Sequence, residues 1–162
     1  MTLSGDLLKQ LQTAVGQSNQ CVTATNGLRT VRCEALQCDP LGVSTTKLLL
    51  ETAELAGVDI AKLEKASQSL CHRVNYLLEP ISPIETDAGG CVVQMRSNPP
   101  QQHENGRFYY ELLLRLGGSV ALYRYEKQPG SARTPVASTL THEVLGRLVD
   151  DFDATIDEVL SS

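Results

Sequence analysis

Side chains that could bind an anion lie near the ends of three strands predicted in the middle of the chain. Residues 91–97, 108–115 and 119–125 have the alternation typical of strands. In an antiparallel meander, the segments 98–106 and 126–135 emerge at the same end of the sheet. Five side chains should gather there: Arg96, His103, Arg107, Lys127 and Arg133. We expect them to bind a phosphate, a carboxylate or an acidic peptide, beside the N-terminus of the last helix.

The same side chains could instead be solvated loop residues, paired in part with Glu104 and Glu126. Charge is distributed unevenly along the chain, which has a net charge of −5. Residues 91–138 contain six Lys/Arg against three Asp/Glu, whereas residues 139–162 contain one against six. The overall acidity argues against broad binding to nucleic acid or to anionic lipid, since both need a positive surface. We therefore expect neither a nucleic acid nor a membrane as a partner.

A second group of side chains favours contact with a protein. Tyr109, Glu111 and Arg115 share one face of the strand 108–115, because side chains alternate across a strand. Tyr123 and Tyr125 share one face of the next strand. If helices cover only the other face of the sheet, these five residues form an amphipathic surface that could bind a partner. An ordinary half-solvated sheet would show the same pattern, and this alternative stays open.

Other residues that could do chemistry are sparse. Cys71 and His72 are adjacent on a predicted helix and point about 100° apart, so they do not face each other as nucleophile and base. The three histidines lie in separate elements without metal-ligand spacing. The chain has no glycine-rich phosphate loop and no nucleophile elbow. We therefore predict no catalytic residue, no metal and no cofactor, and we lean toward a protein that is not an enzyme.

The composition favours a cytoplasmic domain. The five cysteines have no regular spacing and make a poor disulfide framework, which favours a reducing compartment. No apolar run reaches the length of about 18 residues that a membrane span needs. The N-terminus lacks the basic start and apolar stretch of a signal peptide. With 41% apolar and 20% charged residues, we expect a single globular domain over residues 1–162.

The hydrophobic periodicity predicts an α+β fold. The expected helices and strands are, in chain order, helix 4–17, strands 28–38 and 45–55, helix 60–78, strands 81–86, 91–97, 108–115 and 119–125, and helix 141–160. This order, α-β-β-α-β-β-β-β-α, indicates an antiparallel sheet of about six strands with the helices packed on one face. The polar segment 17–27 is expected to be a loop. Segment 45–55 could also be a helix, because its leucines, alanines and glutamates have high helix propensity.

A tight turn is expected between the last two strands. Gly117 and Gly118 could form a two-residue hairpin loop, because glycine adopts positive φ without a Cβ clash.

Parts of the second half of the chain resemble a group of uncharacterised bacterial proteins. The segments that carry this resemblance are Tyr76–Glu85, Val93–Pro100, Tyr109–Leu113, Arg124–Glu126 and the last helix. The group has no assigned activity, so it implies no function. In size, acidity and the helix at each end, the chain also resembles bacterial type III secretion chaperones, which are cytosolic dimers that hold partly unfolded proteins. The predicted order departs from theirs, because the second helix here follows two strands, not three.

These observations favour a non-enzymatic, chaperone- or adaptor-like interaction domain that self-associates and binds a protein partner. The alternative is a small-molecule binding protein, or an enzyme, that acts on an anionic ligand at the basic end of the sheet. In that case Arg96, Arg107 and Arg133 would hold the anion, and His103 would be the general base.

Overall fold

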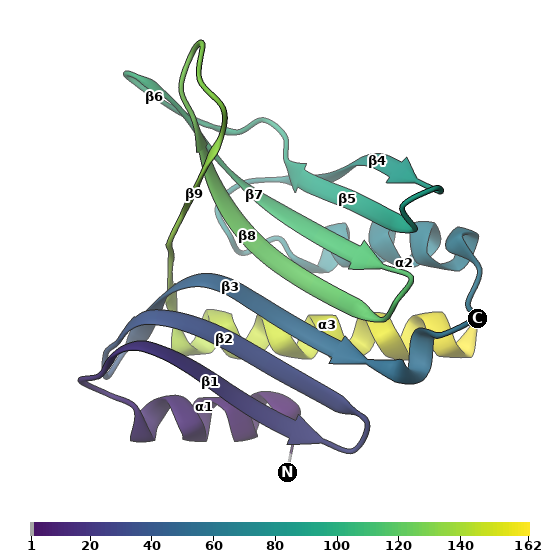
Figure 1. The fold of residues 1–162 in the computed structure, drawn as a ribbon, viewed down its shortest axis with the longest axis horizontal. Helices are drawn as coiled ribbons and strands as arrows, with labels where there is room; N and C mark the ends of the chain where they lie inside the picture. Colours follow the sequence, from purple (N-terminus) through teal and green to yellow (C-terminus); the bar gives the residue numbers. More distant parts are fainter. Residues whose placement is uncertain (1) are drawn as a thin grey trace.

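The three strands in the middle of the chain form the antiparallel meander that the sequence predicts. In the computed structural model, which describes residues 2–162, they are β5 (Val92–Ser97), β7 (Gly106–Arg115) and β8 (Ser119–Lys127) (Figure 1). Tyr109 lies opposite Tyr125, and Met95 lies opposite Leu112. Side chains therefore alternate across the meander with the predicted parity.

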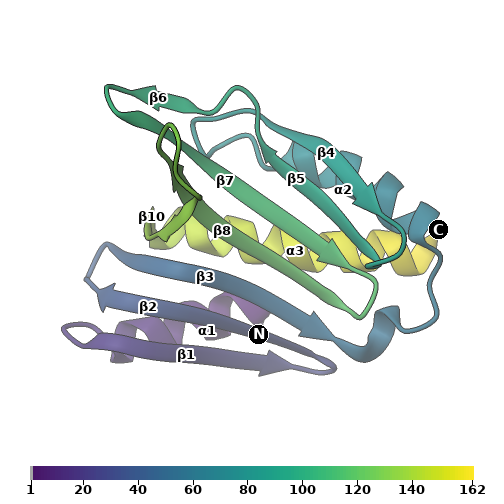
Figure 2. The ribbon, with the colours of Figure 1, turned by 45° about the horizontal axis from the view of Figure 1, so that its top comes forward.

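Over residues 2–162 the protein is α+β, with three α-helices and a large antiparallel sheet. The helices are α1 (Leu3–Thr13), α2 (Ile60–Arg73) and α3 (His142–Ser161), and a short 3-10 helix, η1 (Ala53–Leu55), precedes α2. The remaining strands are β1 (Ser18–Asn26), β2 (Arg29–Cys38), β3 (Gly42–Thr52), β4 (Ile81–Asp87), β6 (Gln101–His103), β9 (Thr134–Val136) and β10 (Ser138–Thr141). Figure 2 shows all three helices behind the sheet, so the opposite face has no helix over it.

The sheet has ten strands in the described part of the chain, and the prediction of about six was wrong. Seven of them follow the order β1-β2-β3-β8-β7-β5-β4. Three short strands pair outside this path: β6 with β7, β9 with β8, and β10 with β3. Short strands have too few residues to show a clear alternation, so the sequence pattern does not reveal them. The element order also changes, because three strands now precede α2.

The segment predicted to be a loop at 17–27 contains β1, and that prediction was wrong. Only two of its side chains, Val22 and Ala24, are buried on the helix side. They lie opposite Cys33 and Val31 of β2, which supply most of the apolar contact. The strand therefore forms because its neighbour provides the packing and the hydrogen bonds, which its own polar sequence does not indicate.

Segment 45–55, for which helix was the open alternative, is a strand as far as Thr52, as predicted, and its last three residues form the 3-10 helix η1. β3 lies between β2 and β8, with Leu48 and Leu50 fully buried against the helices. It pairs with β8 only from Leu48 to Glu51. Before Leu48, the first residues of β3 do not pair with β8. The strands β9 and β10 fill the gap, since β9 pairs with β8 and β10 pairs with the first residues of β3. The linker before α3 therefore completes the sheet.

Helix α2 ends at Arg73, five residues earlier than the apolar pattern predicts. Tyr76 leaves the helical path and packs against α3, where its hydroxyl donates to Asp151 at 2.5 Å and Arg147 lies over its ring at 4.0 Å. Leu77 is buried, but Leu78 has a φ of 66° and is 97% exposed. Leu77 and Leu78 therefore belong to an irregular connection that leads to Pro80 and β4.

The turn between β7 and β8 has three residues, Leu116–Gly118, and the predicted two-residue loop was wrong. Only Gly118 has a positive φ, of 103°. A Cβ on Gly118 would lie 1.9 Å from the carbonyl oxygen of Thr52, and the amide of Thr52 donates to the Gly118 carbonyl at 2.8 Å. Gly118 is thus required by its conformation and by the close approach of β3.

The core lies between the inner face of the sheet and the helices. Its largest fully buried side chains include Leu7, Leu11, Leu63, Leu70, Leu145 and Phe152 from the helices and Leu48, Leu50, Met95, Leu112 and Leu114 from the strands. Helix α3 contacts both α1 and α2 and so links the two ends of the helical layer. Within residues 2–162, no helix has the length and apolar character needed to cross a bilayer.

Candidate functional site

The face of the sheet turned away from the helices is the principal candidate site, and we call it the outer face. On β7 and β8 it consists of the odd-numbered residues, because Arg107 pairs with Lys127, Tyr109 with Tyr125 and Glu111 with Tyr123. On β5 it consists of the even-numbered residues, since Arg96 pairs with Glu111. On β3 it runs from Lys47 through Leu49 to Glu51.

Three tyrosines form an aromatic cluster at the centre of the outer face. The ring centroids of Tyr109 and Tyr125 are 5.8 Å apart, and those of Tyr123 and Tyr125 are 6.2 Å apart. Cations surround the cluster: Lys47 lies 5.9 Å from the ring of Tyr123, and Arg96 lies 5.4 Å from that of Tyr109. Such contacts hold the rings in place, and the hydroxyl of Tyr109 already accepts a hydrogen bond from Arg133.

The segment after β8 folds back over the outer face through Arg133. Its Nη1 donates to Glu111 Oε2 at 2.5 Å, and its guanidinium lies 3.8 Å from the centre of the Tyr125 ring. The amide of Gln94 donates to the same carboxylate oxygen at 2.8 Å, and Glu111 is only 1% exposed. Burial acts to lower the pKa of Arg133, but the hydrogen bond and charge of Glu111 outweigh it and raise this pKa above its ordinary value.

The five residues predicted to contact a protein all lie on the outer face, but their exposure differs. Tyr109 and Glu111 are buried beneath their neighbours, at 5% and 1% exposure. Tyr123 and Tyr125 are half-buried, and Arg115 is exposed at the other end of β7. A partner on this surface could reach Tyr123, Tyr125 and Arg115 directly, and it could reach Glu111 only through Arg133.

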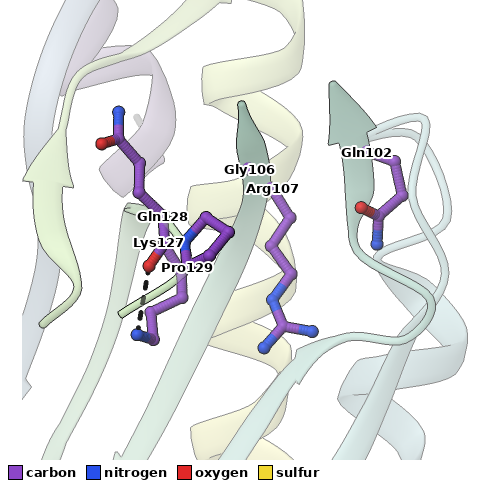
Figure 3. Close-up of a pocket in the computed structure, with 6 residues that line it drawn as sticks. All are labelled: Gln102, Gly106, Arg107, Lys127, Gln128 and Pro129. Atoms are coloured by element: carbon purple, nitrogen blue, oxygen red, sulfur yellow. Dashed lines mark hydrogen bonds between the residues drawn. The ribbon is translucent and has the colours of Figure 1, made fainter. Parts of the chain in front are cut away.

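Four of the five residues predicted to bind an anion also lie on the outer face. Arg107 and Lys127 come from neighbouring strands and line a pocket of about 310 Å³ with Gln102 and Pro129 (Figure 3). Arg96 lines a second pocket of about 240 Å³, to which Arg107 and Tyr109 also contribute. The two predicted sites therefore meet at Tyr109, which contacts Tyr125 on one side and lines the arginine pocket on the other.

His103 lies on the opposite side of the sheet, away from Arg107. It pairs with Gly106, stacks on Phe108 at a centroid distance of 4.4 Å, and has its Nε2 3.6 Å from a carboxylate oxygen of Glu126. The amide of His142, at the start of α3, donates to Leu41 in the β2–β3 turn, and no residue of α3 lines either arginine pocket. Neither feature joins the other predicted anion-binding residues.

The part of the outer face on β3, β5, β7 and β8 is positive although the chain is acidic, whereas Glu85 and Asp87 of the edge strand β4 lie opposite Gln94 and Val92 on the same face. Across β3, β5, β7, β8 and Arg133, six basic side chains face two acidic ones. These are Lys47, Arg96, Arg107, Arg115, Lys127 and Arg133 against Glu51 and Glu111. Since the whole chain has a net charge of −5, the negative charge is concentrated elsewhere, including α3. Such a separation favours acidic ligands on the outer face.

A buried polar network on the inner side was not anticipated. Arg124 Nη2 donates to Glu79 at 3.0 Å and to Gln101 at 2.9 Å, and Glu79 accepts a bond of 2.6 Å from Ser97. The Nη1 of Arg124 is buried without a hydrogen-bond partner in the described part of the chain. The sequence did carry a signal, because Arg124 has the same parity as the core residues Val120 and Leu122.

The cysteines and histidines do not assemble into a reactive group. Burial raises the pKa of the Cys71 thiol to about 11, so very little thiolate exists at neutral pH. Burial likewise raises the pKa of Cys33 to about 11. Over residues 2–162, no three side chains of the types that ligate metals are close enough together to hold an ion.

No family model, no curated protein and no solved structure matches this chain. The function is therefore inferred from the geometry of the outer face.

Proposed function

We propose that this protein is a non-enzymatic interaction domain that holds an acidic polypeptide segment on the outer face of its sheet. The observation that carries the proposal is a positive surface with tyrosines at its centre that no helix covers. Tyrosine and arginine are among the residues that contribute most to binding at protein interfaces, because they combine packing area with directional hydrogen bonds.

The central tyrosines supply the packing for such a partner. Tyr123 and Tyr125 are half-buried by their neighbours, so their positions are already ordered before a partner binds. A pre-ordered surface loses little conformational entropy on binding. The arginines on either side supply charge, with Arg96 and Arg107 toward one end of β7 and Arg115 at the other. An extended acidic segment could contact all three regions.

The chaperone-like part of the proposal draws on the order of the elements. Three strands, β1 to β3, lie between α1 and α2, and type III secretion chaperones also have three strands before their second helix. With this likeness we propose a bacterial, cytoplasmic protein that self-associates. Holding a partner in an extended state requires an open surface, which the outer face supplies.

Binding to an acidic probe tests this proposal. A fluorescein-labelled copolymer of glutamate and tyrosine should bind the wild-type protein in an anisotropy titration, with an affinity that falls as salt is added. The double variant Arg96→Ala/Arg115→Ala should bind at least tenfold more weakly, a loss of about 1.4 kcal/mol. The matched control is Lys9→Ala/Lys65→Ala, which removes two exposed cations from α1 and α2. Absence of binding, or equal loss in both variants, would contradict the proposal.

A small anionic ligand in the arginine pocket is the second candidate. The observation that favours it is that Arg96 and Arg107 line one pocket, and neither forms an ion pair in residues 2–162. An enzymatic version is less favoured, because His103 lies on the other side of the sheet and cannot act as a base there. Thermal unfolding should be measured with a panel of phosphates and carboxylates. A stabilisation that disappears in Arg107→Ala would support this candidate, and no stabilisation would remove it.

A further inference from the structure

The two edges of the sheet differ in how well they are protected against pairing with another strand. Figure 2 shows β4 at one border of the sheet and β1 at the other. Strand β4 contains Pro83, Glu85 and Asp87, and its register shifts between Pro83 and Glu85. Proline, charge and irregular register are the devices by which natural edge strands avoid unwanted pairing.

Strand β1 has none of these devices along its regular part. Its nine residues, Ser18–Asn26, include no charged residue and no proline. Asn19 has a φ of 55° and interrupts the strand, but Gln20–Asn26 pairs with β2 without a break. In the part of the chain that the structure describes, no strand pairs with its other side. An edge of this length and regularity is a template for another strand.

We propose that β1 pairs with β1 of a second copy of this chain, so that two sheets join into one around a two-fold axis at Thr23. A second copy of the chain is a suitable partner, because a two-fold axis pairs the same strand, β1, from both copies in antiparallel orientation. The strand is uncharged, so its pairing brings no like charges together in a chain whose net charge is −5. The proposal does not depend on the function assigned to the outer face.

The register follows from the regular part of the strand. Thr23 is the central residue of Gln20–Asn26, and centring there maximises the number of paired residues. Val22 of one copy then lies opposite Ala24 of the other, which extends the buried side of the sheet. On the outer side, Thr23 lies opposite Thr23, and Cys21 lies opposite Thr25. All of these are apolar, β-branched or small side chains of the kind that pair well across strands.

The mass in solution tests the pairing. Sedimentation of the wild-type chain over a range of concentrations should show a species of twice the monomer mass of 17.6 kDa. Thr23→Lys places two cations opposite each other and should weaken the dimer at least tenfold. The matched control, Thr86→Lys, changes an exposed threonine on the protected edge strand β4 and should leave the dimer intact. A wild-type chain that is monomeric at every concentration overturns the proposal, as does a Thr23→Lys dimer of unchanged stability.

Crosslinking tests the register and does not require a disruptive variant. In a Cys21→Ser background, Thr23→Cys should give a disulfide-linked dimer with copper phenanthroline as oxidant, whereas Thr25→Cys should give far less. Equal crosslinking at both positions, or none at Thr23→Cys, overturns the proposed axis. Thr23 is three strands away from β8, so Thr23→Lys should bind the glutamate–tyrosine copolymer normally. Failure of the dimer and failure of the outer-face proposal are therefore distinguishable.

Discussion

Arg133 covers the carboxylate of Glu111 and thereby neutralises the one acidic side chain at the centre of a basic surface. The two residues are 22 positions apart in the chain, and the turn after β8 brings them together. The ion pair also positions the guanidinium of Arg133 over the ring of Tyr125. The ion pair therefore connects the stability of the sheet with the shape and charge of the surface that we propose to bind a partner.

Loss of Arg133 should destabilise the fold because it leaves Glu111 buried without a cation. We expect Arg133→Met to reduce the free energy of unfolding by about 2 kcal/mol, the scale for an unsatisfied buried charged acceptor. The double variant Arg133→Met/Glu111→Gln should recover most of this loss, since it removes the uncompensated charge. Urea unfolding measures both. Arg107→Met, which disrupts no ion pair, is the control, and a loss as large in that variant would contradict the account.

Stability should fall at acid pH through Glu54. Hydrogen bonds from Arg29 and Thr52 lower the pKa of Glu54 below its ordinary value of about 4.5. Its contribution is therefore complete above that ordinary value and is lost as the pH falls through the lower pKa of the folded state. Urea unfolding between pH 7 and pH 3 should show that Glu54→Gln flattens this decline. Glu64→Gln, on the exposed side of α2, should leave the slope unchanged.

Arg29 itself should be important for stability, because it joins β2, η1 and α3. It donates to Glu54 at 2.7 Å, to Asp153 at 2.6 Å and to Asp157 at 2.8 Å. Arg29→Met should lower the free energy of unfolding by about 3 kcal/mol, since it leaves several carboxylates without a cation. Arg32→Met is the control, because Arg32 is more exposed and forms a longer contact, of 3.4 Å, with Glu51. Equal losses in the two variants would contradict this role.

The two adjacent glycines of the β7–β8 turn should differ in their tolerance of substitution. Gly118→Ala combines a positive φ with a clash against Thr52, so it should cost at least about 1–3 kcal/mol. Gly117→Ala meets no atom within 4 Å and should change the stability little. Thermal melts of the two variants suffice for the comparison. If both variants unfold at the same temperature, β3 does not approach Gly118 as closely as the structure indicates.

The aromatic part of the outer face should contribute to binding separately from its charge. Tyr123→Ala should weaken the binding of the glutamate–tyrosine copolymer even at high salt, because packing is not screened as charge is. Arg115→Ala should weaken it mainly at low salt. Tyr76→Phe, on the helix side, serves as the tyrosine control. Identical salt dependence in Tyr123→Ala and Arg115→Ala would contradict this division.

The sequence predicts the parts of this fold in which side chains alternate over a long stretch. The strands around Tyr109 and Tyr123 and the helix that contains Phe152 were predicted for this reason. Strand β1 was missed because its packing comes from β2, and β9 and β10 because they are too short to show a period. The end of α2 was misplaced because Tyr76 packs against α3, a contact between residues 75 positions apart.

The positions of the predicted site residues depend on two things. The first is which face of a strand each residue lies on, which the sequence shows by alternation. The second is the path of the loops, which the sequence does not show. Parity placed the tyrosines and Arg115 on one face. The path of the 128–133 segment decides that Arg133 covers Glu111, and the path of 98–106 decides that His103 lies on the far side of the sheet. Loop paths depend on tertiary contacts, so sequence patterns do not fix them.

The most direct measurement of the central claim is a map of the binding surface by two-dimensional NMR. Amide signals of the labelled protein would be followed as unlabelled glutamate–tyrosine copolymer is added. We predict that the largest changes occur in β3, β5, β7 and β8, around Tyr123, Tyr125 and Arg96, with little change in α1 and α3. Changes confined to the helices, or no change at all at saturating copolymer, would contradict the account.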